Sequence, residues 1–129
     1  MPIRVSTFQL PSGDWAARMD CFGTIGKEDG ESWLKQVEPG GPFHELPTLA
    51  VTLEIEHITS EGRNSFIRRG NARTVWVAVV VTRPLVRVTA NFAMRVSGNK
   101  KYRLFATERE AVLWLDERVR EDAAQQVGP

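Results

Sequence analysis

The residues best suited to acid–base or metal chemistry gather around the two histidines of the chain. His44 is followed by Glu45, and His57 lies close to Glu54 and Glu56. Imidazole nitrogens and carboxylates are common metal ligands and general bases. On a β-strand, however, Glu56 and His57 point to opposite faces of the sheet, so a third ligand would have to come from elsewhere. We therefore expect no metal site here, and we interpret these side chains as a solvated strand end and a loop histidine.

Cys21 is the only thiol in the chain and the first candidate for nucleophilic chemistry. A catalytic thiol needs a nearby base and partial exposure to solvent. Cys21 instead alternates with Met19 and Ala17 at the two-residue spacing of a strand, which places it among core positions. It has no partner for an internal disulfide and no second sulfur for a zinc site, as suits a reducing compartment. We therefore predict that Cys21 is a buried structural cysteine. We also predict a cytoplasmic protein, because residues 1–10 show no secretory signal.

The charged residues are distributed very unevenly along the chain. Its 129 residues include 17 Lys and Arg and 16 Asp and Glu, for a formal net charge of +1. Residues 62–107, which we call the acid-free segment, nevertheless contain ten of the cations and none of the acids. Ion pairs within the helices of this segment cannot neutralise ten cations. The asymmetry indicates that the segment binds an anionic partner.

Six arginines of the acid-free segment are the candidate partner-binding residues, because the expected apolar stripes assign most of them to exposed positions. They are Arg63, Arg68, Arg69, Arg83, Arg87 and Arg95. The alternative is that part of this charge is neutralised by acids from the ends of the chain, for instance on the C-terminal helix.

The elements that must position these residues follow the order of an α/β protein. Alternating or continuous short apolar runs predict strands at residues 3–10, 15–22, 46–58, 74–82 and 101–105. Apolar stripes and capping residues predict helices at residues 27–38, 60–70 and 84–96, and a long C-terminal helix. That last helix is expected to begin at a capping box made by Thr107 and Glu110.

Strands that are separated by helices favour right-handed crossovers and a parallel sheet. The N-terminal hairpin adds one antiparallel edge. We therefore predict an α/β fold of order ββαβαβαβα, with a mixed sheet of about five strands and about four helices. Residues 1–122 are expected to form a single domain, and residues 123–129 a frayed tail.

This succession of elements resembles the STAS superfamily, the fold of the anti-sigma-factor antagonists, and specifically its SpoIIAA-like branch, which is related in shape to the Sec14 lipid-transfer fold. The resemblance covers nearly the whole chain. The matching pieces are Phe22-Gly23-Thr24-Ile25 before an acidic helix, the strand-to-helix passage 53–63, the strand 75–81 followed by residues 83–95, and Leu104-Phe105 followed by the Ala111 and Trp114-Leu115 positions.

The phosphorylatable STAS proteins carry a regulatory serine in an Asp-Ser-Ser/Thr-Gly turn that opens the second helix. The matching residues here are Thr59-Ser60-Glu61-Gly62. They keep the serine and the glycine, but Thr59 replaces the leading Asp and Glu61 replaces the residue after the serine. The resemblance thus implies Ser60 as a candidate phosphorylation site. The alternative is that Ser60 only caps the helix, which is the ordinary role of serine at such a position.

The resemblance also implies no enzymatic activity, no cofactor and a regulatory role through partner binding, usually by the second helix and adjacent loops. The leading hypothesis is a module that docks an acidic protein through the acid-free segment. The alternative is a peripheral module for anionic lipid, suggested by the Sec14-like kinship. Nucleic acid is a weaker candidate, because the aromatic residues mostly occupy expected core positions. The edge strand 3–10 also offers unpaired backbone for a homodimer.

Overall fold

The N-terminal hairpin forms where a turn-rich tetrapeptide separates two alternating segments. In the computed structural model, which describes residues 3–37, 41–43, 46–62, 64, 76–84, 87–88, 91 and 101–127, β1 (Ile3–Gln9) and β2 (Trp15–Ile25) pair antiparallel. The Leu10 N–H donates to the Asp14 carbonyl at 2.8 Å, and Gly13 adopts a positive φ of 99° between them. A residue without Cβ tolerates that conformation. The predicted hairpin is confirmed.

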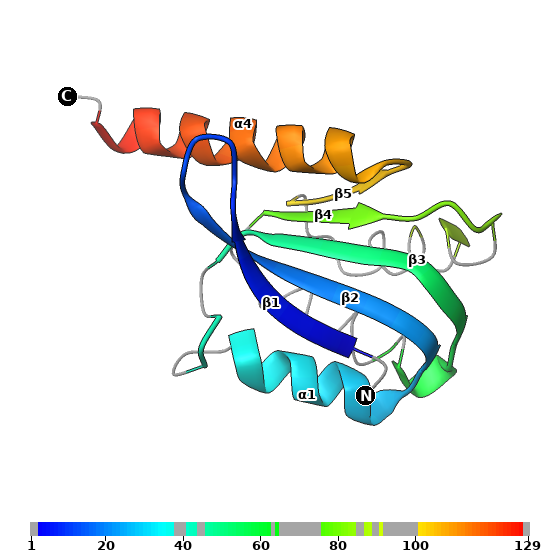
Figure 1. The fold of residues 1–129 in the computed structure, drawn as a ribbon. Coiled ribbons are helices and arrows are strands. Elements are labelled where there is room, and N and C mark those ends of the chain that lie inside the picture. Colours follow the sequence, from blue (N-terminus) through cyan, green and yellow to red (C-terminus); the bar gives the residue numbers. More distant parts are fainter. Residues whose placement is uncertain are drawn as a thin grey trace.

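Three parallel strands complete the sheet (Figure 1). They are β3 (Thr48–Ile58), β4 (Val77–Val80) and β5 (Tyr102–Phe105). The strand order is β1-β2-β3-β4-β5, with the β1–β2 pair antiparallel and every other pair parallel. The predicted five-stranded mixed sheet with one antiparallel edge is therefore confirmed.

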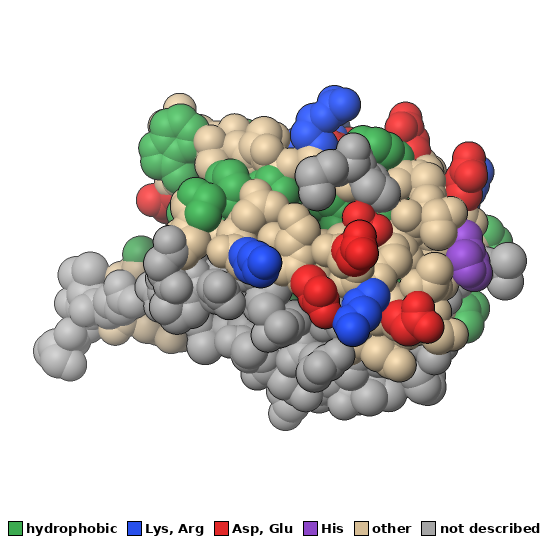
Figure 2. Space-filling view, turned by 90° about the horizontal axis from the view of Figure 1, so that it is seen from below, with side chains coloured by type: hydrophobic (Ala, Val, Ile, Leu, Met, Phe, Trp, Pro, Cys, Tyr) green, Lys and Arg blue, Asp and Glu red, His purple; other side chains and the backbone are tan. Residues whose placement is uncertain are grey.

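Helix α1 (Lys27–Val37) covers one face of the sheet. Its Trp33 is buried and belongs to a core cluster with Met19, Cys21 and Ile25 of β2. The outer side of this helix carries charges of both signs. Figure 2, which shows the molecule from this side, has acidic and basic side chains interspersed and a group of hydrophobic side chains toward one end of the face.

Helix α4 (Glu108–Val127) covers the opposite face, mainly over β3, β4 and β5. Its buried Ala111 and Leu115 pack with apolar side chains of β3 and β4. The helix begins as predicted: the Glu110 N–H donates to Thr107 Oγ1 at 3.2 Å. Its end differs from the expected frayed tail 123–129, since the helix continues through Val127. Alanine and glutamine, good helix formers, fill positions 123–126, and the first helix breakers come only afterwards, at positions 128 and 129.

The other strand and helix boundaries agree with expectation to different degrees. β2 extends past residue 22 to Ile25, and β3 starts at Thr48, directly after Pro47, which has no N–H for a ladder. The expected second and third helices lie mostly outside the described residues. Helical conformation is present at residues 60–62 and 64, and at 84, 87–88 and 91.

Candidate functional site

The turn that contains the candidate phosphorylation site lies where β3 ends. The Thr59 N–H donates to the carbonyl of Ile25 at 2.9 Å, which fixes Thr59 at the end of β2, the neighbouring strand. Thr59 Oγ1 then accepts the N–H of Gly62 at 3.0 Å. Thr59 is therefore the N-cap residue, and the expectation that Ser60 caps this helix is wrong. Ser60 is instead the first helical residue, and it is exposed to solvent.

Gly62 has a steric role in this turn. A Cβ at this position would lie 2.7 Å from the Ile25 carbonyl oxygen and 3.0 Å from the carbonyl carbon of Gly26. Real Cβ atoms do not approach backbone atoms so closely, so the start of the second helix can contact the β2–α1 turn only with glycine here. The glycine at position 62 of this motif is therefore explained by the packing of the second helix against the β2–α1 turn.

Two of the six predicted partner-binding arginines lie among the described residues. Arg83 is exposed, and its Nη1 donates to the carbonyl oxygen of Ile55 at 2.6 Å. β4 pairs with β3 only as far as Val51, so this carbonyl lies beyond the end of β4. Arg87 is exposed one helical turn further on. Arg63, Arg68, Arg69 and Arg95 lie outside the described residues.

Two further cations of the acid-free segment lie against aromatic rings. Lys101 Nζ is 4.9 Å from the centre of the Trp76 ring, and the guanidinium of Arg103 is 5.5 Å from the centre of the Phe105 ring. Such cation–π contacts contribute roughly 0.5–1 kcal/mol at exposed sites. Trp76 is held in turn by a 2.7 Å hydrogen bond from its Nε1 to Asp122 and by an edge-on contact with Trp114.

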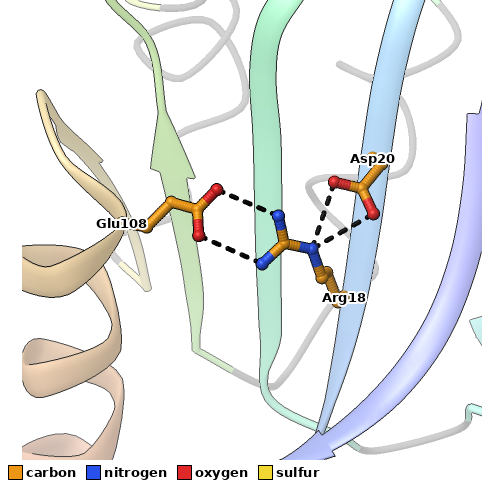
Figure 3. A network of polar contacts seen from close by, with 3 residues as sticks. All are labelled: Arg18, Asp20 and Glu108. Carbon is orange, nitrogen blue, oxygen red and sulfur yellow. Dashed lines mark hydrogen bonds and ion pairs between the residues drawn. The ribbon is translucent and has the colours of Figure 1, made fainter.

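A charged cluster that sequence reasoning missed joins β2 to the start of α4 (Figure 3). Arg18 Nε donates to both carboxylate oxygens of Asp20 at 3.1 Å. The two terminal nitrogens of the same guanidinium donate to Glu108, at 2.9 and 3.2 Å. Hydrogen bonds to Glu108, and then to Asp20, raise the pKa of Arg18 above its usual value. The two-residue spacing of Arg18 and Asp20 indicated a shared face, but their partner Glu108 is 90 residues away.

This cluster forms one wall of an open groove with a volume of about 420 Å³. The groove lies on the α4 side of the sheet, beyond the first turn of α4. Its other lining residues include Arg4, whose guanidinium is 5.7 Å from the centre of the Phe22 ring, and Leu53, which is 38% exposed. Arg18 already pairs with two carboxylates here. The cluster therefore ties elements together rather than offering a free charge for chemistry.

The thiol, histidine and carboxylate groups that the sequence offered for chemistry do not form a common site among the described residues. Cys21 is buried as predicted, and desolvation raises the pKa of its thiol to about 12, so it stays protonated near neutral pH. His57, Glu54 and Glu56 are exposed, whereas His44 and Glu45 lie outside the described residues. Within the part of the chain that the structure describes, no three His, Cys, Asp or Glu side chains are grouped to hold a metal ion. The same part contains no helix with the length and hydropathy needed to cross a bilayer.

The sheet with one antiparallel edge strand and helices on both faces defines a SpoIIAA-like form of the STAS fold. The crystal structure of an uncharacterised protein of the DUF3478 family from Shewanella loihica PV-4, with a SpoIIAA-like fold, matches with a TM-score of 0.63. The match covers 88% of this chain and 93% of that one at 17% sequence identity, so the likeness concerns the fold.

By sequence, the chain belongs to the family DUF7793, a domain of unknown function, whose profile matches residues 43–119. The matched region contains the whole acid-free segment, 62–107, together with β3 and most of α4. No curated protein matches the chain by sequence.

Proposed function

We propose that this protein is a non-catalytic regulatory module that binds an acidic protein partner through its acid-free segment. The observation that carries the proposal is that, among the described residues, acids from the two ends of the chain already pair with cations. Arg18 holds Asp20 and Glu108, Lys27 pairs with Glu31, and Arg118 pairs with Glu117 and Glu121. All of these cations lie outside the acid-free segment.

These pairs bear on the alternative that acids from the two ends of the chain neutralise the cations of the acid-free segment. Carboxylates that already accept hydrogen bonds from arginine are poor partners for a second cation. Arg87, which is exposed and has no acid within residues 62–107, is then available to an external carboxylate. Arginine suits this role, since its planar donor fork binds carboxylates in a bidentate manner and is enriched at interfaces.

Affinity capture with matched charge reversals tests this proposal. The test variant carries Arg68→Glu, Arg69→Glu and Arg87→Glu. The control variant carries Lys27→Glu, Lys35→Glu and Arg109→Glu, which make the same change in net charge at exposed positions of α1 and α4. We expect a protein that wild type and control both recover and that the test variant loses. Equal recovery by all three chains would contradict the proposal.

Ser60 supplies a candidate switch for this binding. Its hydroxyl is exposed at the first position of the second helix, and Arg63 follows three residues later. A phosphate adds a charge of about −1.5 to −2, which would compete with an acidic partner for the neighbouring arginines. We expect Ser60→Asp to weaken recovery of the partner and Ser60→Ala to leave it unchanged. An equal effect of the two substitutions would rule out a role for the charge.

A membrane surface is the second candidate partner, and one observation favours it. Val88 is 66% exposed and directly follows the exposed Arg87, so a cation and an apolar side chain are presented together. Such pairs suit the boundary of an anionic bilayer. Co-sedimentation with phosphatidylcholine vesicles, with and without phosphatidylserine, tests this function. Binding that needs phosphatidylserine and is lost in Val88→Asp would support this function. If the protein does not sediment with either kind of vesicle, the function is contradicted.

A further inference from the structure

The outer edge of β1 presents unpaired backbone. β1 is the terminal strand of the sheet, and Thr7 lies opposite Ala17 of β2. The Ala17 N–H points away from β1, since it donates to the carbonyl of Pro47 at 2.8 Å. Residues of an antiparallel strand turn their N–H and C=O groups alternately to one side and the other. Thr7, and with it Ile3, Val5 and Gln9, therefore turn these groups to the outer edge.

This edge lacks the features that usually protect an edge strand. Proline, bulges and inward or repeated charges commonly prevent edge strands from pairing with another chain. β1 keeps an unbroken register with β2 over all seven residues, contains no proline, and has Arg4 as its only charged side chain. Among the residues that the structure describes, no strand pairs with the outer side of β1.

An exposed aromatic side chain and a hollow lie at opposite ends of β1 on the α1 face. At the hairpin end, Trp15 is 55% exposed although it is a large apolar side chain. It shares this face with Ala17 and Met19, because side chains alternate along β2. At the other end, a hollow of about 270 Å³ separates β1 from α1. The hollow is lined mainly by Ile3, Val5, Asp29, Ser32, Trp33 and Gln36.

We propose that two copies of this chain pair through β1, antiparallel, about a two-fold axis that passes Ser6 perpendicular to the sheet. This axis places the outward groups of Val5 opposite those of Thr7 in the second copy. It also places Arg4 opposite Phe8, so the only charge of the strand meets an aromatic ring and no like charge. The result is one continuous sheet across both copies.

The same axis brings the hairpin end of each copy to the hollow of the other. Ile3 of one copy lies opposite Gln9 of the second. Within that second copy, Gln9 pairs with Trp15 of β2. Each exposed indole then faces the hollow between β1 and α1 of the other copy. A large aromatic side chain in a pocket is typical of the residues that dominate interface energies. Because both features occur in one chain, a second copy is the partner that satisfies both at once.

A proline substitution at Thr7 tests the pairing. Thr7 is exposed and its N–H points outward, so Thr7→Pro removes a donor of the proposed interface and none of the β1–β2 ladder. Thr7→Ala keeps the N–H and is the matched control. In sedimentation velocity we expect wild type and Thr7→Ala to dimerise with increasing concentration. We expect Thr7→Pro to raise the dissociation constant at least about tenfold, since symmetry removes two hydrogen bonds.

Two further measurements do not depend on the folding of the proline variant. Trp15→Ala, whose backbone is intact, should weaken the dimer in the same assay. Hydrogen exchange of the wild type should slow at the amides of Val5, Thr7 and Gln9 as concentration rises, with no change at those of Arg4, Ser6 and Phe8. A chain that stays monomeric, or a dimer that Trp15→Ala and Thr7→Pro leave intact, would overturn the inference. It does not rest on the proposed function, because β1 lies outside the acid-free segment.

Discussion

Arg18 shows how a single side chain connects distant parts of this protein. Its guanidinium lies between Asp20 on the same strand and Glu108 at the first turn of α4. Charge-assisted, bidentate hydrogen bonds of this kind are stronger than those between neutral groups. The position of Glu108 within the first turn is favourable as well, because a carboxylate there meets the positive end of the helix dipole. The cluster therefore helps to set where α4 begins over the sheet.

We expect Arg18→Met to lower the free energy of unfolding by about 1–2 kcal/mol, because the two carboxylates lose a partly buried partner. Urea denaturation followed by circular dichroism measures this. Arg109→Met, at an exposed position of the same helix turn, is the control and should change stability by less than about 0.5 kcal/mol. A double-mutant cycle with Glu108→Gln separates the pair from the rest. Additive effects would show that the two side chains are not coupled.

Cys21 is expected to be unreactive in the native state. Burial raises the pKa of its thiol from 9.0 to about 12. Since the raised pKa means that the folded state favours the protonated form, this contribution to stability is complete below pH 9 and is lost as the pH rises toward 12. A thiol reagent at pH 8 should modify Cys21 only as fast as the protein unfolds. Rapid modification of the folded chain would contradict the burial.

At the scale of secondary-structure elements, the close approach of two turns determines where the second helix starts. The β2–α1 turn ends at Gly26, and residues 59–62 lie directly against it through the Thr59 to Ile25 hydrogen bond. Both turns follow parallel neighbouring strands, so both lie at the same edge of the sheet. The position of Ser60, and hence its exposure, depends on this contact.

Two glycine substitutions test this packing. Gly62→Ala would place a Cβ 2.7 Å from the Ile25 carbonyl oxygen, and we expect a loss of about 1–3 kcal/mol in stability from overpacking. Gly26→Ala is the matched control, because its Cβ would meet its nearest neighbour at 3.8 Å, an ordinary contact. Thermal unfolding of both variants measures the difference. Equal unfolding midpoints would show that the turns are not tightly packed.

At the scale of the whole molecule, the sheet needs a helix packed against each of its two faces. Trp33 of α1 packs in the cluster on one face, and Ala111 and Leu115 of α4 pack in the cluster on the other. The last residues of α4 contribute little to this cover, since Ala123, Ala124 and Gln125 are exposed. The apolar surface that α4 buries is therefore concentrated in its first half.

Two truncated chains test this distribution. A chain that ends at residue 122 keeps the Asp122 partner of Trp76, and its unfolding midpoint should stay within about 3 °C of the full chain. A chain that ends at residue 107 exposes the apolar residues of β3 and β4, and we expect it to lose cooperative unfolding and to aggregate. Calorimetry distinguishes these outcomes. A cooperative transition in the shorter chain would show that α4 is dispensable for folding.

The sequence by itself determined the features that depend on neighbouring residues. Alternation along β2 placed Cys21 in the core, a turn-rich tetrapeptide produced the hairpin, and Thr107 marked the start of α4. Each of these signals acts within a few residues, because strand period, turn geometry and capping are local properties of the chain. The mixed sheet with one antiparallel edge also followed, since a hairpin joined to alternating strands and helices favours this arrangement.

Only the tertiary structure decided which distant groups meet. Glu108 reaches Arg18, the Thr59 N–H reaches the carbonyl of Ile25, and Arg83 contacts the carbonyl of Ile55. These contacts depend on strand register and on where each helix crosses the sheet, which are set by the packing of both faces together. Cys21, which first suggested chemistry, is explained by local pattern, since it lies at a core position of β2. The role of Arg18 in joining β2 to α4, by contrast, required the folded chain.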